Sequence, residues 1–156
     1  MTPAIKTAEK AKIDFSVHQY EHDSSVASFG LEASEKLGVC SATVFKTLVA
    51  SLDNGDLVVA IIPVDQKLNL KAVAKASKAK KAKMAEPLDV ERSTGYVLGG
   101  VSPLGQKKRL KTLLDDSAKE HSTIYVSAGR RGLEIELKPS DLLSLTNGQF
   151  VALKAE

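Results

Sequence analysis

A lysine stands inside the most strongly apolar strand pattern of this chain. Residues 43–50 read as a buried β-strand, in which alternate side chains share a face. Lys46 therefore shares its face with Val44 and Leu48, whereas Phe45 takes the other face. Since neither face is suited to solvent, an ammonium here is costly unless a partner meets it. Two interpretations stay open: the lysine extends its charge to the strand end, or it points into a pocket for an anionic ligand.

This strand is the first half of a predicted hairpin, turning at 53–56 and returning along 57–64. A second hairpin is predicted from 123–128 and 132–137 around Gly129-Arg130-Arg131. Further patterns predict a helix from Thr2-Pro3, a strand at 14–21, a helix at 31–37 closed by Gly38, a helix capped by Asn69, a helix opening at 138–141 and a last strand at 150–153. The order indicates an α+β fold, one domain over residues 1–156, with a mixed, mostly antiparallel sheet curling toward a barrel and flanked by helices.

Composition places the chain among globular proteins of a reducing compartment. It has 156 residues with 43% hydrophobic and 26% charged content, enough to bury a core without metals or disulfides. The single Cys40 excludes an internal disulfide framework, and we expect a buried, inert thiol there. Neither a signal peptide nor an apolar run of membrane-spanning length is visible. We therefore expect a cytoplasmic protein without a membrane partner.

Basic residues gather in three segments of a chain whose net charge is +3. The segments are the lysines between 67 and 83, the run Lys107-Lys108-Arg109 with Lys111, and Arg130-Arg131. They could converge on a nucleic-acid backbone. Alternatively, the first cluster only solvates an amphipathic helix whose inner face includes Leu70 and Val73. The other two lie at turns, where ligand contacts concentrate.

Several chemistries do not fit the sequence. His18 and His22 would lie about 13 Å apart on a strand, too far to share a metal ion. The glycine-rich loop 99–105 matches neither a Walker A motif nor a dinucleotide fingerprint. No metal or cofactor is therefore expected. The loop is either a plain turn or a rigid backbone whose N–H groups suit a phosphate, a carboxylate or an oxyanion.

Five motifs occur in the order found in one family. They are Phe29-Gly30, Val44-Phe45-Lys46-Thr47-Leu48, Arg92-Ser93-Thr94-Gly95-Tyr96, Gly99-Gly100-Val101-Ser102-Pro103-Leu104-Gly105 and the segment from Ser127 to Ile135. Together they resemble YbaK/EbsC proteins, the freestanding relatives of the editing domain of bacterial prolyl-tRNA synthetase. The resemblance spans essentially the whole chain and is strongest to the YbaK branch, the Cys-tRNA(Pro) deacylases.

The resemblance implies hydrolysis of Cys-tRNA(Pro) at the tRNA acceptor end, with prolyl-tRNA synthetase as a possible partner. The substrate's own thiol would attack its ester carbonyl, which explains a hydrolase without a visible nucleophile–base pair. By resemblance, Lys46 anchors the terminal adenosine or its phosphate, and the backbone of Gly99 and Gly100 contacts the aminoacyl group. The implied substrate-binding residues are Tyr20, Phe29, Thr47, Ser127 and Glu134; Glu134 stands where aspartate is more usual. Lys107, Lys108, Arg130 and Arg131 are expected to contact tRNA.

Three alternatives stay open. The chain could hydrolyse Ala-tRNA(Pro) or another small aminoacyl ester, since relatives specific for alanine share much of this motif set. It could bind tRNA acceptor ends without chemistry. It could also use Lys46 as a Schiff-base lysine, although the sequence offers no second acid or base for that reaction.

Overall fold

The computed structural model describes the backbone of residues 1–23 and 29–156 and the side chains of residues 1–23 and 31–156. The side chain of Phe29 therefore lies outside the described residues. The helices are α1 (Pro3–Ala11), α2 (Phe29–Leu37), α3 (Leu70–Ala76), α4 (Pro87–Thr94) and α5 (Pro139–Thr146), with short 3₁₀ helices η1 (Ser41–Thr43) and η2 (Asp116–Glu120). The strands are β1 (Phe15–Gln19), β2 (Phe45–Leu52), β3 (Leu57–Pro63), β4 (Ala82–Met84), β5 (Lys111–Asp115), β6 (Ile124–Arg130), β7 (Leu133–Leu137) and β8 (Gln149–Val151).

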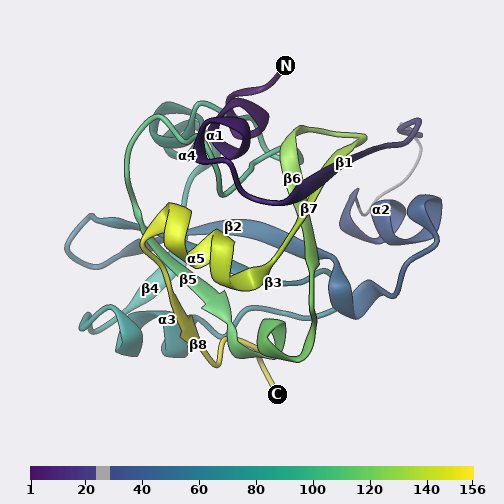
Figure 1. The fold of residues 1–156 in the computed structure, drawn as a ribbon. Helices are drawn as coiled ribbons and strands as arrows, with labels where there is room; N and C mark the ends of the chain where they lie inside the picture. Colours follow the sequence, from purple (N-terminus) through teal and green to yellow (C-terminus); the bar gives the residue numbers. More distant parts are fainter. Residues whose placement is uncertain (24–28) are drawn as a thin grey trace.

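A five-stranded sheet crosses the middle of the molecule (Figure 1), with the strand order β4-β2-β3-β5-β8. The β2–β3 hairpin is antiparallel and pairs Lys46 with Ile62. β5 joins β3 in parallel, and β8 joins β5 in parallel. The sheet is therefore mixed, because β5 and β8 arrive by long connections that contain α4 and α5.

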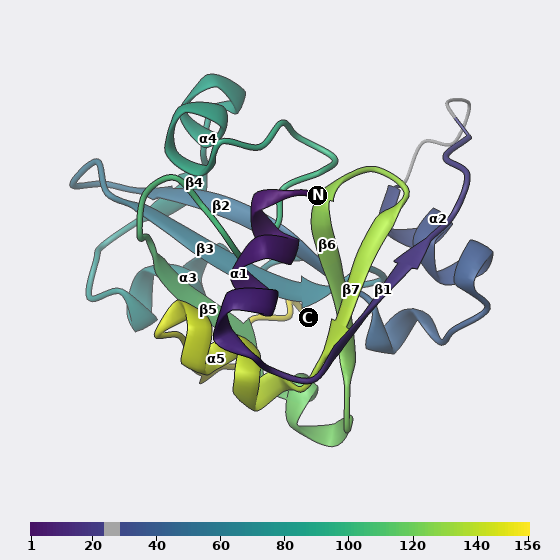
Figure 2. The same cartoon turned by 45° about the horizontal axis from the view of Figure 1, so that its top comes forward.

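A three-stranded antiparallel sheet, in the order β1-β7-β6, packs across the larger one (Figure 2). Its inner face supplies Val126, Ile135 and Leu137 to a core that also contains Phe45 and Ile61 of the large sheet. The opposite face of the large sheet packs against α3 through Ala50, Val58, Ile62 and Val73. Both faces of β2 are thus covered by apolar side chains, as its sequence predicted.

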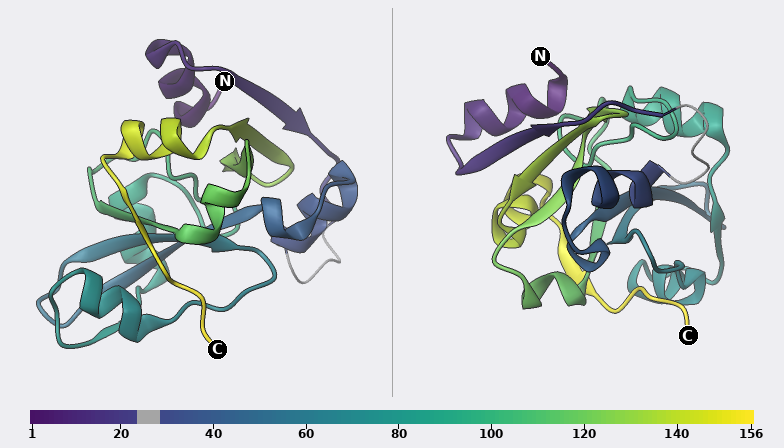
Figure 3. Two further views of the ribbon diagram at one scale, coloured as in Figure 1. Left: turned by 60° about the horizontal axis from the view of Figure 1, so that its bottom comes forward. Right: turned by 90° about the vertical axis from the view of Figure 1, so that its right-hand side faces the viewer.

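The two sheets meet where β2 begins. An isolated parallel bridge joins Val44 to Tyr125 of β6, and beyond it the strands diverge, as both views in Figure 3 show. On its far side, β2 pairs with β4 only from Ala50 to Leu52. Residues 45–48 of β2 consequently have no strand partner on that edge, and the sheets do not close into a barrel.

Local signals at helix ends have the geometry that the sequence predicted. The Thr2 hydroxyl accepts a hydrogen bond from the Ile5 amide at the start of α1. The Asn69 side chain accepts one from the Ala72 amide at the start of α3, and Gly38 follows α2 with a positive φ of 68°. Among the described residues, no helix has the length and apolar character needed to cross a membrane.

One expectation about a side chain is wrong: Cys40 is exposed, not buried. It lies in the surface connection between the Gly38 cap of α2 and η1, where no core residue covers it. The thiol shares a shallow surface hollow with His121.

Candidate active site

The gap between the diverging strands β2 and β6 contains a pocket of about 340 Å³. That volume suits a small ligand or one end of a larger one. Most of its lining comes from four regions: the end of β1, the first half of β2, the loop after α4, and the β6–β7 hairpin; α2 and the residue after β3 add one side chain each. The lining residues are Tyr20, Ala33, Val44, Phe45, Lys46, Thr47, Leu48, Val64, Leu98, Gly99, Val101, Ser127, Arg130, Arg131 and Glu134.

Lys46 lies on the unpaired edge of β2 and is half-buried. Burial lowers the pKa of its ammonium, and the charge of the nearby Asp65 offsets part of this shift. Among the described residues, no carboxylate lies within 4 Å of its Nζ atom. A half-buried cation without a close ion pair is available to an anionic ligand, so the structure favours the pocket interpretation over the strand-end one.

The glycine-rich loop packs directly against the β6–β7 turn. A Cβ atom on Gly100 would lie 2.9 Å from the Cα atom of Arg130, so only glycine permits this approach without displacement. Gly99 has a positive φ of 91°, and its backbone lines the pocket. The Arg131 guanidinium donates a hydrogen bond of 3.4 Å to the Leu98 carbonyl. The loop and the arginine turn therefore form one wall, with Gly100 buried behind Gly99.

Two acidic groups at the β1–β7 side have unusual protonation behaviour. Burial raises the pKa of Glu134 to about 8. Burial, followed by the negative charge of Glu134, raises the pKa of the Tyr20 phenol to about 12. Tyr20 is held in place where its amide donates to the Gly132 carbonyl. The pocket therefore presents a neutral phenol beside a carboxyl group whose protonated form is favoured by burial, and a bound cation would favour its ionised form.

The two aliphatic hydroxyl groups of the described lining, those of Ser127 and Thr47, are not activated as nucleophiles. The Ser127 Oγ accepts a hydrogen bond of 3.1 Å from the Gly129 amide. The Thr47 Oγ1 is buried and has no hydrogen-bond partner in the described part of the chain. The lining residues that the structure describes include no histidine. The arrangement can bind and orient an anionic substrate and stabilise developing charge, but it does not show a nucleophile–base pair of its own.

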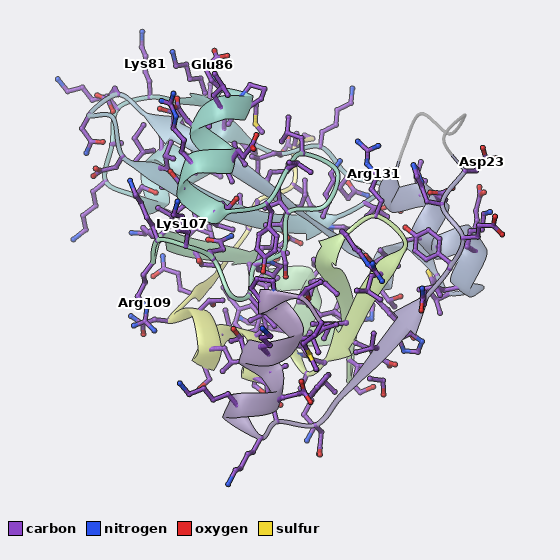
Figure 4. All side chains as sticks on the ribbon, turned by 90° about the horizontal axis from the view of Figure 1, so that it is seen from above. Asp23, Lys81, Glu86, Lys107, Arg109 and Arg131 are labelled. Atoms are coloured by element: carbon purple, nitrogen blue, oxygen red, sulfur yellow. The ribbon has the colours of Figure 1, made fainter. Side chains whose placement is uncertain are left out.

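The pocket brings together most of the residues that the resemblance singled out, namely Lys46, Thr47, Gly99, Tyr20, Ser127, Glu134, Arg130 and Arg131. Lys107 and Lys108 line a different hollow, beside Thr7 and Thr146. In Figure 4, Lys107 lies near α4 and Arg109 lies on the same side of the molecule, nearer α5, whereas Arg131 lies across the molecule, nearer α2. No local sequence signal indicates the apolar wall of Ala33, Val64 and Leu98, because these side chains meet only through the tertiary fold.

Fold and pocket together define a class: a small α+β ligand-binding protein in which a half-buried lysine on β2 lines the same pocket as a glycine loop and an arginine turn. The chain belongs to the aminoacyl-tRNA editing domain family, whose pattern matches residues 23–145. The expected family resemblance is thereby confirmed.

Individual relatives agree with this assignment. The chain is 44% identical over 153 residues to the Enterococcus faecalis protein named "Putative Cys-tRNA(Pro)/Cys-tRNA(Cys) deacylase EbsC", covering 97% of this chain and 92% of the relative. It is 27% identical to the Escherichia coli K12 protein named "Multifunctional Ser/Thr-tRNA deacylase ProXp-y", covering 80% of this chain and 83% of that protein. A solved structure described as "a putative trans-editing enzyme for prolyl tRNA synthetase" superposes with a TM-score of 0.86 at 22% identity, over 99% of this chain and 96% of that one. That last similarity shows the α+β fold.

Proposed function

We propose that this protein is a trans-editing hydrolase that cleaves the aminoacyl ester of Cys-tRNA(Pro). Membership in the editing-domain family supports cleavage of an aminoacyl-tRNA, and the name of the 44% identical relative supports cysteine as the aminoacyl group. Prolyl-tRNA synthetase is the proposed source of the mischarged tRNA. A hydrolytic site after synthesis is needed where binding alone separates amino acids of similar size poorly.

One observation carries the mechanism: the pocket combines a half-buried lysine with a rigid glycine loop, and its described lining residues include no nucleophile–base pair. Such a site suits a substrate that brings its own nucleophile. In the proposed reaction, the cysteinyl thiolate forms a bond to its own ester carbonyl carbon, and the C–O bond to the ribose breaks. The ribose oxygen takes up a proton, and water later opens the cyclic thiolactone. The protein then supplies orientation and charge stabilisation.

The proposed roles follow the position of each residue. Lys46 holds the terminal adenosine or its phosphate, and Arg130 and Arg131 at the exposed rim meet the tRNA backbone. The Gly99 backbone contacts the aminoacyl group, while buried Gly100 lets the loop approach the arginine turn. Tyr20, Thr47, Ser127 and Glu134 surround the ester, and Phe29 retains its proposed place at the substrate. Lys107 and Lys108 are proposed to contact tRNA outside the pocket.

The test is a panel of tRNA(Pro) charged with cysteine, alanine, serine or proline and scored for release of the amino acid. We expect cysteine to be removed fastest, and the serine ester to react far more slowly. A hydroxyl group stays un-ionised near pH 7, whereas a thiol of pKa about 8.5 supplies a few per cent of thiolate. Cys40→Ala serves as the control and should retain activity, because the reacting thiol belongs to the substrate.

The same panel decides among the alternatives. Preferential cleavage of the alanine or serine ester would replace cysteine as the substrate, and the Escherichia coli relative makes serine a specific candidate. Binding of charged tRNA without cleavage would indicate a binding module. Trapping of a carbonyl compound on Lys46 by borohydride would indicate Schiff-base chemistry instead.

A further inference from the structure

Glu134 is a buried carboxyl group that has no partner in the described structure. The residue is 7% exposed, and it lines the pocket from β7. Its side chain makes no hydrogen bond and no ion pair within the described residues, whereas Glu136 on the same strand contacts His18 at 2.9 Å and Thr123 at 2.6 Å. Two glutamates on one face of one strand thus have opposite environments.

An unpaired carboxyl group in this position is unfavourable for the folded protein on its own. Buried polar groups are nearly always hydrogen-bonded, and a buried charge without a partner is costlier still. Burial accordingly raises the pKa of Glu134 to about 8. A group of this kind, directed into a pocket, indicates that the missing partner is supplied by the ligand.

The charges around the pocket indicate which group of the ligand pairs with Glu134. Lys46, Arg130 and Arg131 are cations that suit the phosphates of a nucleotide. Glu134 is the one carboxylic acid among the lining residues that the structure describes, so it suits a cation. An aminoacyl ester of a nucleotide carries a single cation, the α-ammonium group.

We propose that the Glu134 carboxylate binds the α-ammonium group of the aminoacyl ester, an assignment that rests on the deacylase function proposed above. The strand register supports this orientation, because Glu134 pairs directly with Ser127 on β6, while Lys46 lies across the gap on β2. The amino end of the substrate then lies against β7, and the nucleotide end lies toward Lys46 and the arginine turn.

This contact gives the site a preference that size alone does not provide. A free aminoacyl ester has the ammonium group, whereas an N-acylated or peptidyl ester presents a neutral amide to the buried carboxylate. Sites that contain a buried polar partner reject ligands that cannot pair with it much more strongly than ligands that differ by a methylene group. The protein should therefore spare peptidyl-tRNA and act on tRNA that carries a single unblocked amino acid.

The experiment compares three proteins on two esters. The proteins are the wild type, Glu134→Gln, and the matched control Glu136→Gln, which changes the same strand and face outside the pocket. The esters are cysteinyl-tRNA(Pro) and the same tRNA carrying 3-mercaptopropionate, which keeps the thiol but lacks the amine. For each ester, kcat/KM of the variant is divided by kcat/KM of the wild type, so that the intrinsic reactivity of the ester cancels.

Glu134→Gln should lower kcat/KM for the cysteinyl ester by on the order of tenfold to a hundredfold, the size of a hydrogen bond to a charged group. It should leave the mercaptopropionyl ester within about twofold of the wild type. Glu136→Gln should change neither ester beyond about twofold. An equal loss on both esters, or no loss on either, would overturn the assignment, because Glu134 would then act on the carbonyl, on pocket shape or on nothing.

A binding measurement separates this result from failure of the deacylase function. Calorimetry with cysteinyl-adenosine linked through a stable 3′ amide, and with its desamino analogue, needs no catalysis. The wild type should bind the amine-bearing compound more tightly, and Glu134→Gln should remove that difference. If the wild type cleaves neither ester, the deacylase proposal fails, and equal binding of the two amides by the wild type would overturn the Glu134 assignment independently.

Discussion

At the scale of single residues, the site combines a cation and an acid whose burial costs folding free energy. Lys46 lacks a close ion pair, and Glu134 lacks any partner within the described structure. Such groups are rarely retained for stability alone, and they cluster at functional sites. Substitution should therefore separate their effect on activity from their effect on folding.

Lys46→Ala should reduce deacylation by on the order of a hundredfold or more while the protein stays folded. The change removes a charged contact to the reacting substrate, which is typically worth ~2–4 kcal/mol. Lys46→Arg should fail as well, because a planar guanidinium does not replace a compact ammonium group in a fitted pocket. Lys83→Ala, an exposed strand lysine outside the pocket, is the control. Single-turnover assays with circular dichroism measure both properties, and a folded, fully active Lys46→Ala protein would refute the assigned role.

Glu134 and Glu136 should make the stability of the protein depend on pH in opposite directions. Since burial raises the pKa of folded Glu134 to about 8, the folded state retains a proton that the unfolded state releases as the pH rises above about 4.3. The free energy of unfolding therefore falls between about pH 4.3 and 8. Glu134→Gln removes this loss, so its melting temperature relative to wild type should rise across that range and then level off.

For Glu136, the pH dependence of the free energy of unfolding has the opposite sign. The hydrogen bond from Thr123 leads the contacts that lower the pKa of Glu136, so its stabilising effect is present above its unfolded pKa and is lost as the pH falls. Glu136→Gln should accordingly be destabilising at pH 7, and the difference should shrink in acid. Thermal melts of both variants from about pH 2.5 to 8.5 give the comparison, because the Glu136 contribution is lost below its unfolded pKa of about 4.3. Parallel curves for the two variants would mean that their environments do not differ as the structure indicates.

At the scale of secondary-structure elements, sequence reasoning worked where local chemistry sets the outcome. Both hairpins, the caps at Thr2 and Asn69, and the faces of β2 were predicted because turn residues, capping side chains and strand alternation act over a few residues. The helix α4 and the short strands β4 and β5 were missed. α4 has exposed Leu88 near its start and few buried apolar residues, so its helical period is weak. β5 is a five-residue parallel strand whose pairing depends on distant β3 and β8.

In the candidate site, too, some features were predictable from local sequence and others depend on the tertiary fold. The alternation of β2 indicated that Lys46 lies in an apolar setting, and the family motifs assembled most of the lining. The pocket itself depends on two tertiary facts: β6 leaves β2 after the Val44–Tyr125 bridge, and β4 pairs only with the far half of β2. The exposure of Cys40 likewise depends on packing that no local pattern encodes.

The contact between the glycine loop and the arginine turn should be sensitive to a single methyl group. Gly100→Ala places a Cβ atom 2.9 Å from backbone of Arg130, so one of the two segments must move and the wall of the pocket opens. We expect kcat/KM to fall at least tenfold, since small displacements of positioning groups are costly in rate. Gly55→Ala is the control, because Gly55 has a positive φ of 91° but open space around its Cβ position. That variant should lose on the order of 1 kcal/mol of stability from backbone strain and keep its activity.

At the scale of the whole molecule, the basic residues divide into groups at different distances from the chemistry. Arg130 and Arg131 border the pocket, Lys107 and Lys108 border a separate hollow, and the exposed lysines Lys71 and Lys75 lie on α3, with Val73 and Ala74 turned to the core. A tRNA that places its acceptor end in the pocket extends well beyond it. The groups outside the pocket can therefore contribute to affinity only for a long substrate.

Replacing Lys107 and Lys108 together with alanine should weaken cleavage of full-length tRNA but not of a short cysteinyl-adenosine ester. Each lost phosphate contact reduces the salt dependence of binding by close to one unit in a plot of log affinity against log salt, so the double variant should lower that slope by roughly two. KM should rise more than kcat falls, because these contacts hold the tRNA equally well before and during the reaction.

Lys71→Ala with Lys75→Ala removes the same charge from α3 and should leave the slope unchanged. An equal effect of both double variants would mean that net charge rather than a defined tRNA path is responsible, and a loss on the short ester would place Lys107 and Lys108 in the support of the pocket itself.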